Sequence, residues 1–300
     1  MSMDFLQIIE VSPRDGIQNE TKLLSTKQKL MLIRKAHEAG ITRMEVTSFV
    51  NPKRVPQMAD ADIVAQKHPQ TLDAIGLILN RRGFERAVAA GLNEVNFVIV
   101  ASETFSQRNQ NTGTFETIKI METLRTPPQQ NIRLSVTIGA AFGCPFEGEV
   151  SISRLMNVVE AVMFYQPDEL ALADTIGVAT PRDISERIRI IQRTYPDIPL
   201  RLHLHNTRNT GIANAWAGVE AGVRRLDASL GGTGGCPFAP NATGNIATED
   251  LVYMLKRSGL PTGIDLDAAI DAAKWLEEQL GHSVPGQVMK AGRFPMSQNC

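Results

Sequence analysis

Two histidines separated by one residue are the first candidates for chemistry in this chain. His203 and His205 lie in the run Arg-Leu-His-Leu-His, which has the composition of a β-strand. In an extended strand, residues i and i+2 project to the same side, so both imidazoles can reach one ion while Leu204 faces the opposite layer. The alternative interpretation, that both rings serve packing, places two polar groups on one face. The spacing therefore predicts one side of a metal site.

Further oxygen ligands are available elsewhere in the sequence. Asp15 follows the first apolar strand pattern, and Asn245 follows a glycine-rich stretch. Two imidazoles, a carboxylate and an amide oxygen form a mixed set that suits Mg²⁺, Mn²⁺ or, less well, Zn²⁺. We therefore predict that Asp15, His203, His205 and Asn245 bind a divalent metal. The remaining histidines lack such a pairing and are expected to be structural: His37, His68 and His282.

A cysteine follows the glycine-rich stretch. Leu-Gly-Gly-Thr-Gly-Gly precedes Cys236, and glycines give a loop the backbone freedom to close over a substrate and place a thiol. A thiol can donate a proton to a carbanion. The alternative is that Cys236 is a small buried hydrophobe, as free cysteine usually is. Cys144 is expected to be structural, and Cys300 is terminal and uninformative.

Charged residues next to these candidates predict a polar shell. Arg14 directly precedes Asp15 and offers a permanent planar cation, suited to holding a carboxylate or stabilising a developing enolate oxygen; a surface ion pair is the alternative. Glu45 and Asp174 lie inside apolar strand patterns, where unpaired charges would be costly. We expect them to pair with Arg14 and the metal shell, unless the strand assignment is wrong. Gln18 is expected nearby.

The elements that must position these residues alternate along the whole chain. Short runs rich in Val, Ile and Leu alternate with amphipathic stretches, which is typical of βαβ units and a parallel sheet. Eight such pairs predict a (β/α)8 barrel, with a doubly wound sheet as the alternative. Most candidates then lie at the carboxyl ends of strands, where barrels carry their chemistry, and Glu45 lies within the second strand. Strands are expected near 5–11, 43–49, 73–79, 94–100, 132–140, 168–173, 200–205 and 225–230, and helices near 25–39, 82–90, 151–165, 181–194, 209–221 and 247–258.

Length and composition favour a single catalytic domain over residues 1–300. The barrel is expected to span about 5–258, followed over 259–300 by an amphipathic helix at 265–281 and a tail without clear periodicity. Lys+Arg (31) and Asp+Glu (32) nearly cancel, so no electrostatic footprint for nucleic acid or an anionic membrane is present. The N-terminus lacks the pattern of a signal or transit peptide, and three cysteines predict no disulfide framework. A cytoplasmic enzyme with a small-molecule substrate is expected.

Several motifs together resemble the 3-hydroxy-3-methylglutaryl-CoA lyase family, within the metal-dependent TIM-barrel lyases and synthases that share an Arg-Asp pair after the first strand. The similarity runs from about residue 5 to 258. Its motifs are Val11-Ser-Pro-Arg-Asp-Gly-Ile-Gln-Asn-Glu20, Thr47-Ser-Phe-Val-Asn-Pro-Lys53, Val55-Pro-Gln-Met-Ala-Asp60, Asp174-Thr-Ile-Gly177, Gly234-Gly-Cys-Pro-Phe238 and Gly244-Asn-Ile-Ala-Thr-Glu-Asp-Leu-Val-Tyr-Met254.

This resemblance implies a retro-aldol cleavage of a 3-hydroxyacyl-CoA, first of all of 3-hydroxy-3-methylglutaryl-CoA to acetoacetate and acetyl-CoA. The four predicted ligands would hold the family's divalent ion at the substrate's hydroxyl and carboxylate. Asp15 or His203 would take the hydroxyl proton, Arg14 would stabilise the enolate, and Cys236 would take part in its protonation. Gln18, Glu45 and Asp174 would support the polar shell. A symmetric homodimer is expected, with Trp275 in the C-terminal helix on a candidate apolar face.

The chain departs from the lyase pattern just after the histidines. The best-known lyases read His-x-His-Asp-Thr-Tyr-Gly, whereas this chain reads His-Leu-His-Asn206-Thr-Arg208-Asn. Arg208 either recognises a further carboxylate of the substrate or lies on the surface. The acyl group is therefore left open, and a related 3-hydroxy-3-substituted acyl-CoA is the alternative substrate.

Three other functions are compatible with the same family but less favoured. A condensing acyl-CoA synthase usually carries an additional C-terminal regulatory domain, and only about 40 residues follow the predicted barrel. A carboxyltransferase would present a lysine on a central strand, and the runs 135–142 and 169–174 contain none. A non-catalytic binding protein has no need to keep the metal ligands, the arginine and the cysteine together.

Overall fold

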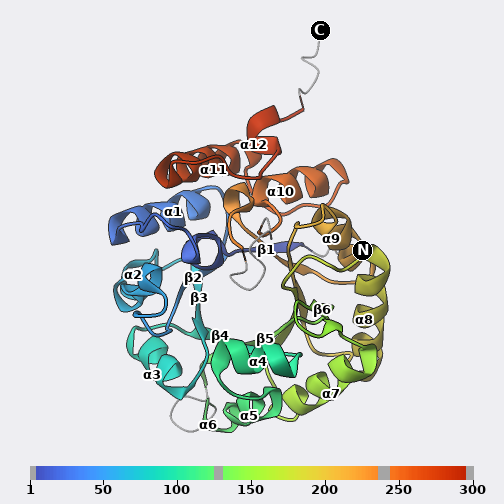
Figure 1. The fold of residues 1–300 in the computed structure, drawn as a ribbon. Helices are drawn as coiled ribbons and strands as arrows, with labels where there is room; N and C mark the ends of the chain where they lie inside the picture. The colour runs from blue at the N-terminus through green and yellow to red at the C-terminus, as the bar shows by residue number, and fades with distance from the viewer. Residues whose placement is uncertain (1–4, 125–130, 236–243, 295–300) are drawn as a thin grey trace.

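The chain folds as a closed barrel of eight parallel strands surrounded by helices (Figure 1). The computed structural model describes residues 5–124, 131–235 and 244–294. The strands follow one another around the barrel in the order β1-β10-β9-β8-β5-β4-β3-β2, so the last barrel strand pairs with the first. This confirms the (β/α)8 barrel over the doubly wound sheet. The barrel strands are β1 (Gln7–Glu10), β2 (Arg43–Ser48), β3 (Asp73–Ile78), β4 (Glu94–Val100), β5 (Arg133–Gly139), β8 (Glu169–Asp174), β9 (Leu200–Leu204) and β10 (Arg225–Ala228).

Helices cover the outside of the barrel, and their starts and ends follow local signals in the sequence. Ser25 forms the expected capping box with Gln28 at the first helix, and Thr180 with Pro181 begins a later one. Gly40 follows the first helix with a φ of +98°. The helices are α1 (Thr26–Glu38), α2 (Ala61–Lys67), α3 (Arg81–Ala89), α4 (Glu103–Gln110), α5 (Thr114–Lys119), α6 (Met121–Leu124), α7 (Ile152–Met163), α8 (Pro181–Thr194), α9 (Gly211–Glu220), α10 (Thr248–Arg257), α11 (Leu266–Leu280) and α12 (Val288–Ala291).

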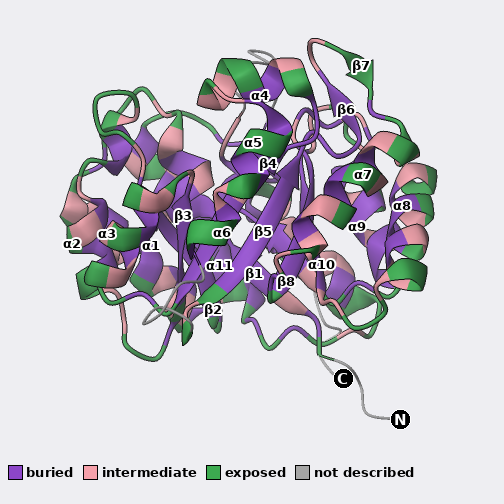
Figure 2. Cartoon of the chain, turned by 90° about the horizontal axis from the view of Figure 1, so that it is seen from below, coloured by how far each residue is buried: buried purple, intermediate pink, exposed green. Residues whose placement is uncertain are grey.

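The barrel strands are buried almost throughout because one face points into the barrel and the other lies under the helices (Figure 2). The outward-facing side chains join those of the helices in one hydrophobic core. Inside the barrel, by contrast, several charged side chains are buried, among them Arg43, Glu94, Glu169 and Arg201. They form ion pairs with one another, so part of the inside of this barrel is charged.

Some elements were not expected from the sequence. Helices α2 and α4–α6 lie outside the helical stretches named from the sequence, because they are short and their apolar periodicity is correspondingly weak. A small antiparallel hairpin, β6 (Gly143–Cys144) and β7 (Gly148–Glu149), also follows β5. Within 282–300, where the sequence has no clear periodicity, the structure has α12, a single turn that is too short to show one; its N-cap Gln287 and its first residue Val288 donate backbone N–H groups to Asp250.

The C-terminal helix packs onto the barrel rather than standing apart from it. Helix α11 contacts α1, α10 and the turn η4 (Leu230–Gly232), and its apolar residues are buried there. Trp275 is half-buried, with the Lys35 ammonium over its ring. The apolar face of α11 is therefore used within the chain, and the expected homodimer stays a prediction. Among the residues described, no helix is both long and apolar enough to span a membrane; the expected cytoplasmic location stays a prediction.

Candidate active site

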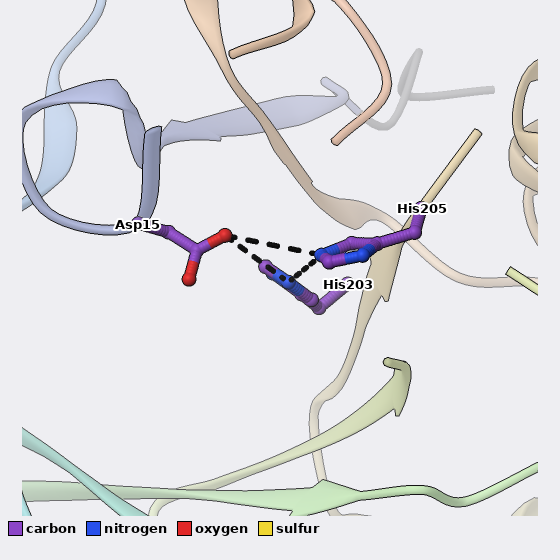
Figure 3. A group of neighbouring side chains, drawn as sticks. All are labelled: Asp15, His203 and His205. Carbon is purple, nitrogen blue, oxygen red and sulfur yellow. Dashed lines mark hydrogen bonds and ion pairs between the residues drawn. The ribbon is translucent and has the colours of Figure 1, made fainter. Parts of the chain in front are cut away.

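The predicted metal ligands meet at the carboxyl-terminal mouth of the barrel (Figure 3). His203 is the last but one residue of β9 and His205 follows the strand, with Leu204 between them in the core. The two Nε2 atoms lie 3.3 Å apart, and they lie 3.8 Å and 3.9 Å from Oδ2 of Asp15. Two lone-pair nitrogens and a carboxylate oxygen turned toward one point repel one another unless a cation or proton lies between them. This arrangement could hold a metal ion.

Asn245 reaches the same place from the segment after the glycine-rich loop. It forms a β-bridge with His205, and its Nδ2 donates to Oδ2 of Asp15 at 2.7 Å and to the Thr233 carbonyl at 3.0 Å. Its buried Oδ1 has no hydrogen-bond partner within the described part of the chain. An unsatisfied buried carbonyl oxygen beside two imidazoles and a carboxylate suits a metal ligand.

Arg14 and Asp15 are positioned by a short turn directly after β1. The turn η1 (Ser12–Gly16) is a single π-helical turn, a local widening that is frequent at functional sites. Gly16 is required there because a Cβ would lie 2.4 Å from Oγ1 of Thr233 and 2.6 Å from Oγ of Ser229. This close approach presses the turn against the base of the glycine-rich loop.

Arg14 stands between two carboxylates. Its Nε donates to Glu45 and its Nη1 to Asp15, which confirms that Glu45 is paired within a correctly assigned strand. Glu45 also accepts from Nδ2 of Asn96 at 2.8 Å. Burial alone would raise the pKa of Asp15, but Arg14, His205 and His203 outweigh it and hold that pKa well below its ordinary value. Asp15 is therefore an anion, as a metal ligand must be.

Asp174 ends β8 but does not pair with Arg14 as expected. It accepts the backbone N–H groups of Val178 and Ala179 at 2.9 Å and 3.0 Å, so it shapes the loop that follows its own strand. Burial raises the pKa of Asp174 despite those hydrogen bonds. A carboxylate satisfied by backbone N–H groups needs no cationic partner, an option that strand patterning cannot reveal.

Gln18 and the residues after the histidines lie at the rim. Gln18 is half-buried and accepts from Oγ of Ser48 at 3.5 Å. Arg208 is exposed, and its Nη1 donates to the carbonyls of Ile176 and Gly177 at 2.9 Å and 3.0 Å. Asn206 accepts from the N–H of Gly211 at 2.9 Å, at the start of α9. Arg208 thus ties two neighbouring rim loops together.

The glycine-rich loop begins against the metal ligands. Gly234 has a φ of +115°, and a Cβ there would lie 2.5 Å from Nδ2 of Asn245 and 3.3 Å from Oδ2 of Asp15. Nδ2 of Asn19, in the loop after β1, donates to the Gly235 carbonyl at 2.9 Å. Cys236 itself lies outside the described residues, so its role stays a prediction. Cys144 is buried, with its Sγ 2.9 Å from Oγ of Ser102, in keeping with a structural role.

Four buried charged residues around this site were not singled out from the sequence. Glu10 accepts from the N–H groups of Ser12 and Leu230, at the two loops that build the site. Glu249 accepts from the Gly231 N–H. Inside the barrel, Asp227 and Arg201 stand behind His203. The signal that picked out Glu45, a charge inside an apolar strand pattern, also marks Asp227 and Arg201.

The family follows from comparison with known proteins. The HMGL-like family model matches residues 5–276. The chain belongs to the HMGL-like family. It is 44% identical to the (R)-citramalyl-CoA lyase of Chloroflexus aurantiacus over 97% of this chain and 96% of that protein. It is 37% identical to a hydroxymethylglutaryl-CoA lyase of Bacillus subtilis over 93% of this chain and 95% of that protein.

A solved member of the HMGL-like family has the same fold. An HMG-CoA lyase from Acinetobacter baumannii, in complex with coenzyme A and 3-methylmalate, superposes with a TM-score of 0.92 at 40% identity, covering 99% of both chains. Family membership and these relatives confirm the resemblance seen in the motifs. They also identify the protein as a carbon–carbon lyase.

Proposed function

We propose that the protein is a divalent-metal-dependent lyase that cleaves a 3-hydroxyacyl-CoA carrying a second carboxylate, by retro-aldol chemistry. The observation that carries this proposal is the convergence of Asp15, His203 and His205 on one point beside the Arg14 guanidinium. Its family relatives that act on acyl-CoA thioesters give the substrate class. The reaction breaks the bond between carbon 2 and carbon 3, leaving a carbonyl at carbon 3 and the enolate of a thioester at carbon 2.

The residues present fit a divalent ion. The donor set combines two imidazole nitrogens, a carboxylate held ionised and the unpartnered amide oxygen of Asn245. Mixed sets of imidazole, carboxylate and amide donors suit Mg²⁺ or Mn²⁺, and Zn²⁺ less well because its catalytic sites usually take three protein ligands from His, Cys, Asp and Glu and leave out amide oxygens. When bound, such an ion acidifies a coordinated hydroxyl and neutralises a nearby carboxylate.

The chain's own residues carry the remaining steps. Asp15 takes the proton from the substrate's 3-hydroxyl, since its carboxylate lies at the point where that hydroxyl would bind. His203, the other base expected from the sequence, would have no free lone pair once its Nε2 held the ion and its Nδ1 shared a proton with Asp227. Arg14 is buried and permanently charged, and it lies at the same point, so it stabilises the enolate oxygen as the carbon–carbon bond breaks. Cys236, predicted from the sequence, takes part in protonating the enolate carbon. Glu45 holds Arg14, and Gln18 lies at the rim.

Two substrates are compatible with this site. 3-Hydroxy-3-methylglutaryl-CoA has one methylene between its hydroxyl-bearing carbon and its free carboxylate, whereas citramalyl-CoA has none. The sequence motifs favour 3-hydroxy-3-methylglutaryl-CoA. The identity of 44% to the Chloroflexus citramalyl-CoA lyase, against 37% to the Bacillus hydroxymethylglutaryl-CoA lyase, favours citramalyl-CoA. Arg208, expected either to contact a substrate carboxylate or to lie on the surface, is exposed and engaged by backbone carbonyls, so we do not assign it the substrate's carboxylate.

The test is turnover of both thioesters by protein freed of metal with EDTA and then reloaded with Mg²⁺ or Mn²⁺. Cleavage of 3-hydroxy-3-methylglutaryl-CoA yields acetyl-CoA and acetoacetate, and cleavage of (R)-citramalyl-CoA yields acetyl-CoA and pyruvate. Product analysis therefore distinguishes the two reactions. We expect no turnover without metal and restored turnover with it. Failure of the metal-loaded protein to cleave any carboxylated 3-hydroxyacyl-CoA would overturn the proposal.

A further inference from the structure

We propose that Asp227, held in place by Arg201, is a positioning residue that fixes the tautomer of His203 so that its Nε2 lone pair faces the metal; this inference rests on the proposed metal-dependent function. Neither residue contacts the point where the ligands converge. Both lie inside the barrel, and Asp227 contacts Nδ1 of His203, whereas Nε2 faces the other ligands. Asp227 would decide only which ring nitrogen of His203 carries the proton, and the set of metal ligands would stay the same.

The strand register places Asp227 beside His203. Strands β9 and β10 are parallel neighbours, and these two residues are directly paired across them. Oδ2 of Asp227 lies 3.1 Å from Nδ1 of His203, and both side chains are buried. An ionised carboxylate only accepts hydrogen bonds, so Nδ1 must carry the proton. Nε2 then keeps its lone pair, and this is the nitrogen turned toward Asp15 and His205.

Arg201 keeps Asp227 in this position. Its Nη1 lies 3.6 Å from Oδ1 of Asp227, and its side chain is fully buried. The guanidinium also lies 3.2 Å from Glu169 and donates from Nη2 to Oγ1 of Thr137 at 3.4 Å. Three strands besides its own, β5, β8 and β10, therefore contribute contacts to Arg201.

A chain of hydrogen bonds inside the barrel connects Arg201 to Arg14 on the other side of the site. Thr137 donates to Asn96 at 2.9 Å, Asn96 donates to Glu45, and Glu45 holds Arg14. The contacts thus run from Arg14 to His203 beneath the ligands. Of the two histidines, only His203 is supported in this way within the described residues, since Nδ1 of His205 has no partner there.

The test replaces Asp227 with an amide of the same size. In Asp227→Asn, the side-chain NH₂ can donate to Nδ1 and drive the proton to Nε2, which blocks metal binding. Outer hydrogen-bond partners of metal-binding histidines typically contribute about 10- to 100-fold in affinity. We expect the Mn²⁺ affinity, measured by titration with electron paramagnetic resonance, to fall within that range. Asp271→Asn is the matched control, because it makes the same change at an exposed position of α11, outside the barrel, and its Mn²⁺ affinity should stay near wild type.

A second measurement reads the tautomer directly and needs no variant. In the metal-free wild-type protein, at a pH where the ring is neutral, ¹⁵N shifts of His203 should show a protonated Nδ1. A protonated Nε2 would overturn the inference, as would an Asp227→Asn variant that binds Mn²⁺ like wild type. A wild-type protein that binds no divalent metal would instead overturn the proposed function.

Discussion

Arg14 has two tasks in this site, because it contacts two carboxylates and, in the proposed reaction, the enolate oxygen as well. It neutralises Glu45 inside the barrel and lowers the pKa of Asp15 at the metal site. In the proposed reaction the same guanidinium supplies a permanent positive charge to the enolate. A residue that serves both stability and chemistry needs a variant that separates the two.

Replacement of Arg14 should therefore affect turnover more than metal binding. Arg14→Met removes the donor to the enolate, and loss of one such donor costs about 10²- to 10³-fold in kcat. Arg14→Lys keeps the charge but loses the planar fork, so its kcat should lie between wild type and Arg14→Met. Steady-state kinetics with Mn²⁺-loaded proteins checks the order. Near-normal turnover of Arg14→Met would show that the enolate is stabilised elsewhere.

The elements around the site are held together by contacts between loops that are far apart in sequence. The turn η1 packs on the base of the glycine-rich loop through Gly16, and Asn19 reaches Gly235. The C-terminal segment joins them, since the N–H of Gly286 donates to the Gly231 carbonyl at 2.8 Å. The glycine-rich loop thus starts from a fixed base whose position also sets Asp15 and Asn245.

A methyl group at Gly234 should disturb this base and the metal site together. Gly234→Ala places its Cβ 2.5 Å from Nδ2 of Asn245, so Asn245 must shift. Gly91→Ala is a matched control: Gly91 has a φ of +87° and no atom within 4 Å of an added Cβ. Both variants should lose about 1–2 kcal/mol of unfolding free energy from backbone strain. Only Gly234→Ala should bind Mn²⁺ more weakly in a titration; equal affinities would mean that the loop yields without moving the ligands.

At the scale of the whole molecule, buried charge makes stability depend on pH. Glu249 is fully buried under the glycine-rich loop, and one of its oxygens, Oε1, has no hydrogen-bond partner in the described ranges. Burial raises its pKa to about 8, and the neighbouring Asp250 and Glu10 add to the effect. The pKa of Glu10 is raised by burial as well. The folded protein therefore holds protons that the unfolded chain releases.

The sign of the resulting pH dependence follows from linkage. Between about pH 5 and pH 8 the folded state keeps a proton on Glu249 that the unfolded state has lost, so stability falls as the pH rises through this window. Glu249→Gln stays neutral and should reduce the fall by an amount on the order of a few kcal/mol. Denaturant unfolding at several pH values measures it, with the exposed Glu149→Gln as control. Identical slopes for wild type and Glu249→Gln would contradict the assignment.

The barrel and most residues of the candidate site can be predicted from the amino-acid sequence alone. Short apolar runs predict the strands, and the amphipathic stretches between them predict the helices. The His-x-His spacing predicts that the two imidazoles lie on the same face of a strand. Asp15 could be named because it follows the first strand, Glu45 because it is a charge within an apolar strand, and Asn245 because it follows the glycine-rich stretch.

The tertiary structure decided which buried charges meet. Asp174 turns to its own loop, Asp227 supports His203 through the register of two strands, and Arg208 ties two loops together. Short helices such as α2 and α12 also form only because packing stabilises segments whose own propensity is weak. Pairings of this kind depend on strand register and on distances across the barrel. Local sequence contains neither, because both arise when the first strand closes onto the last.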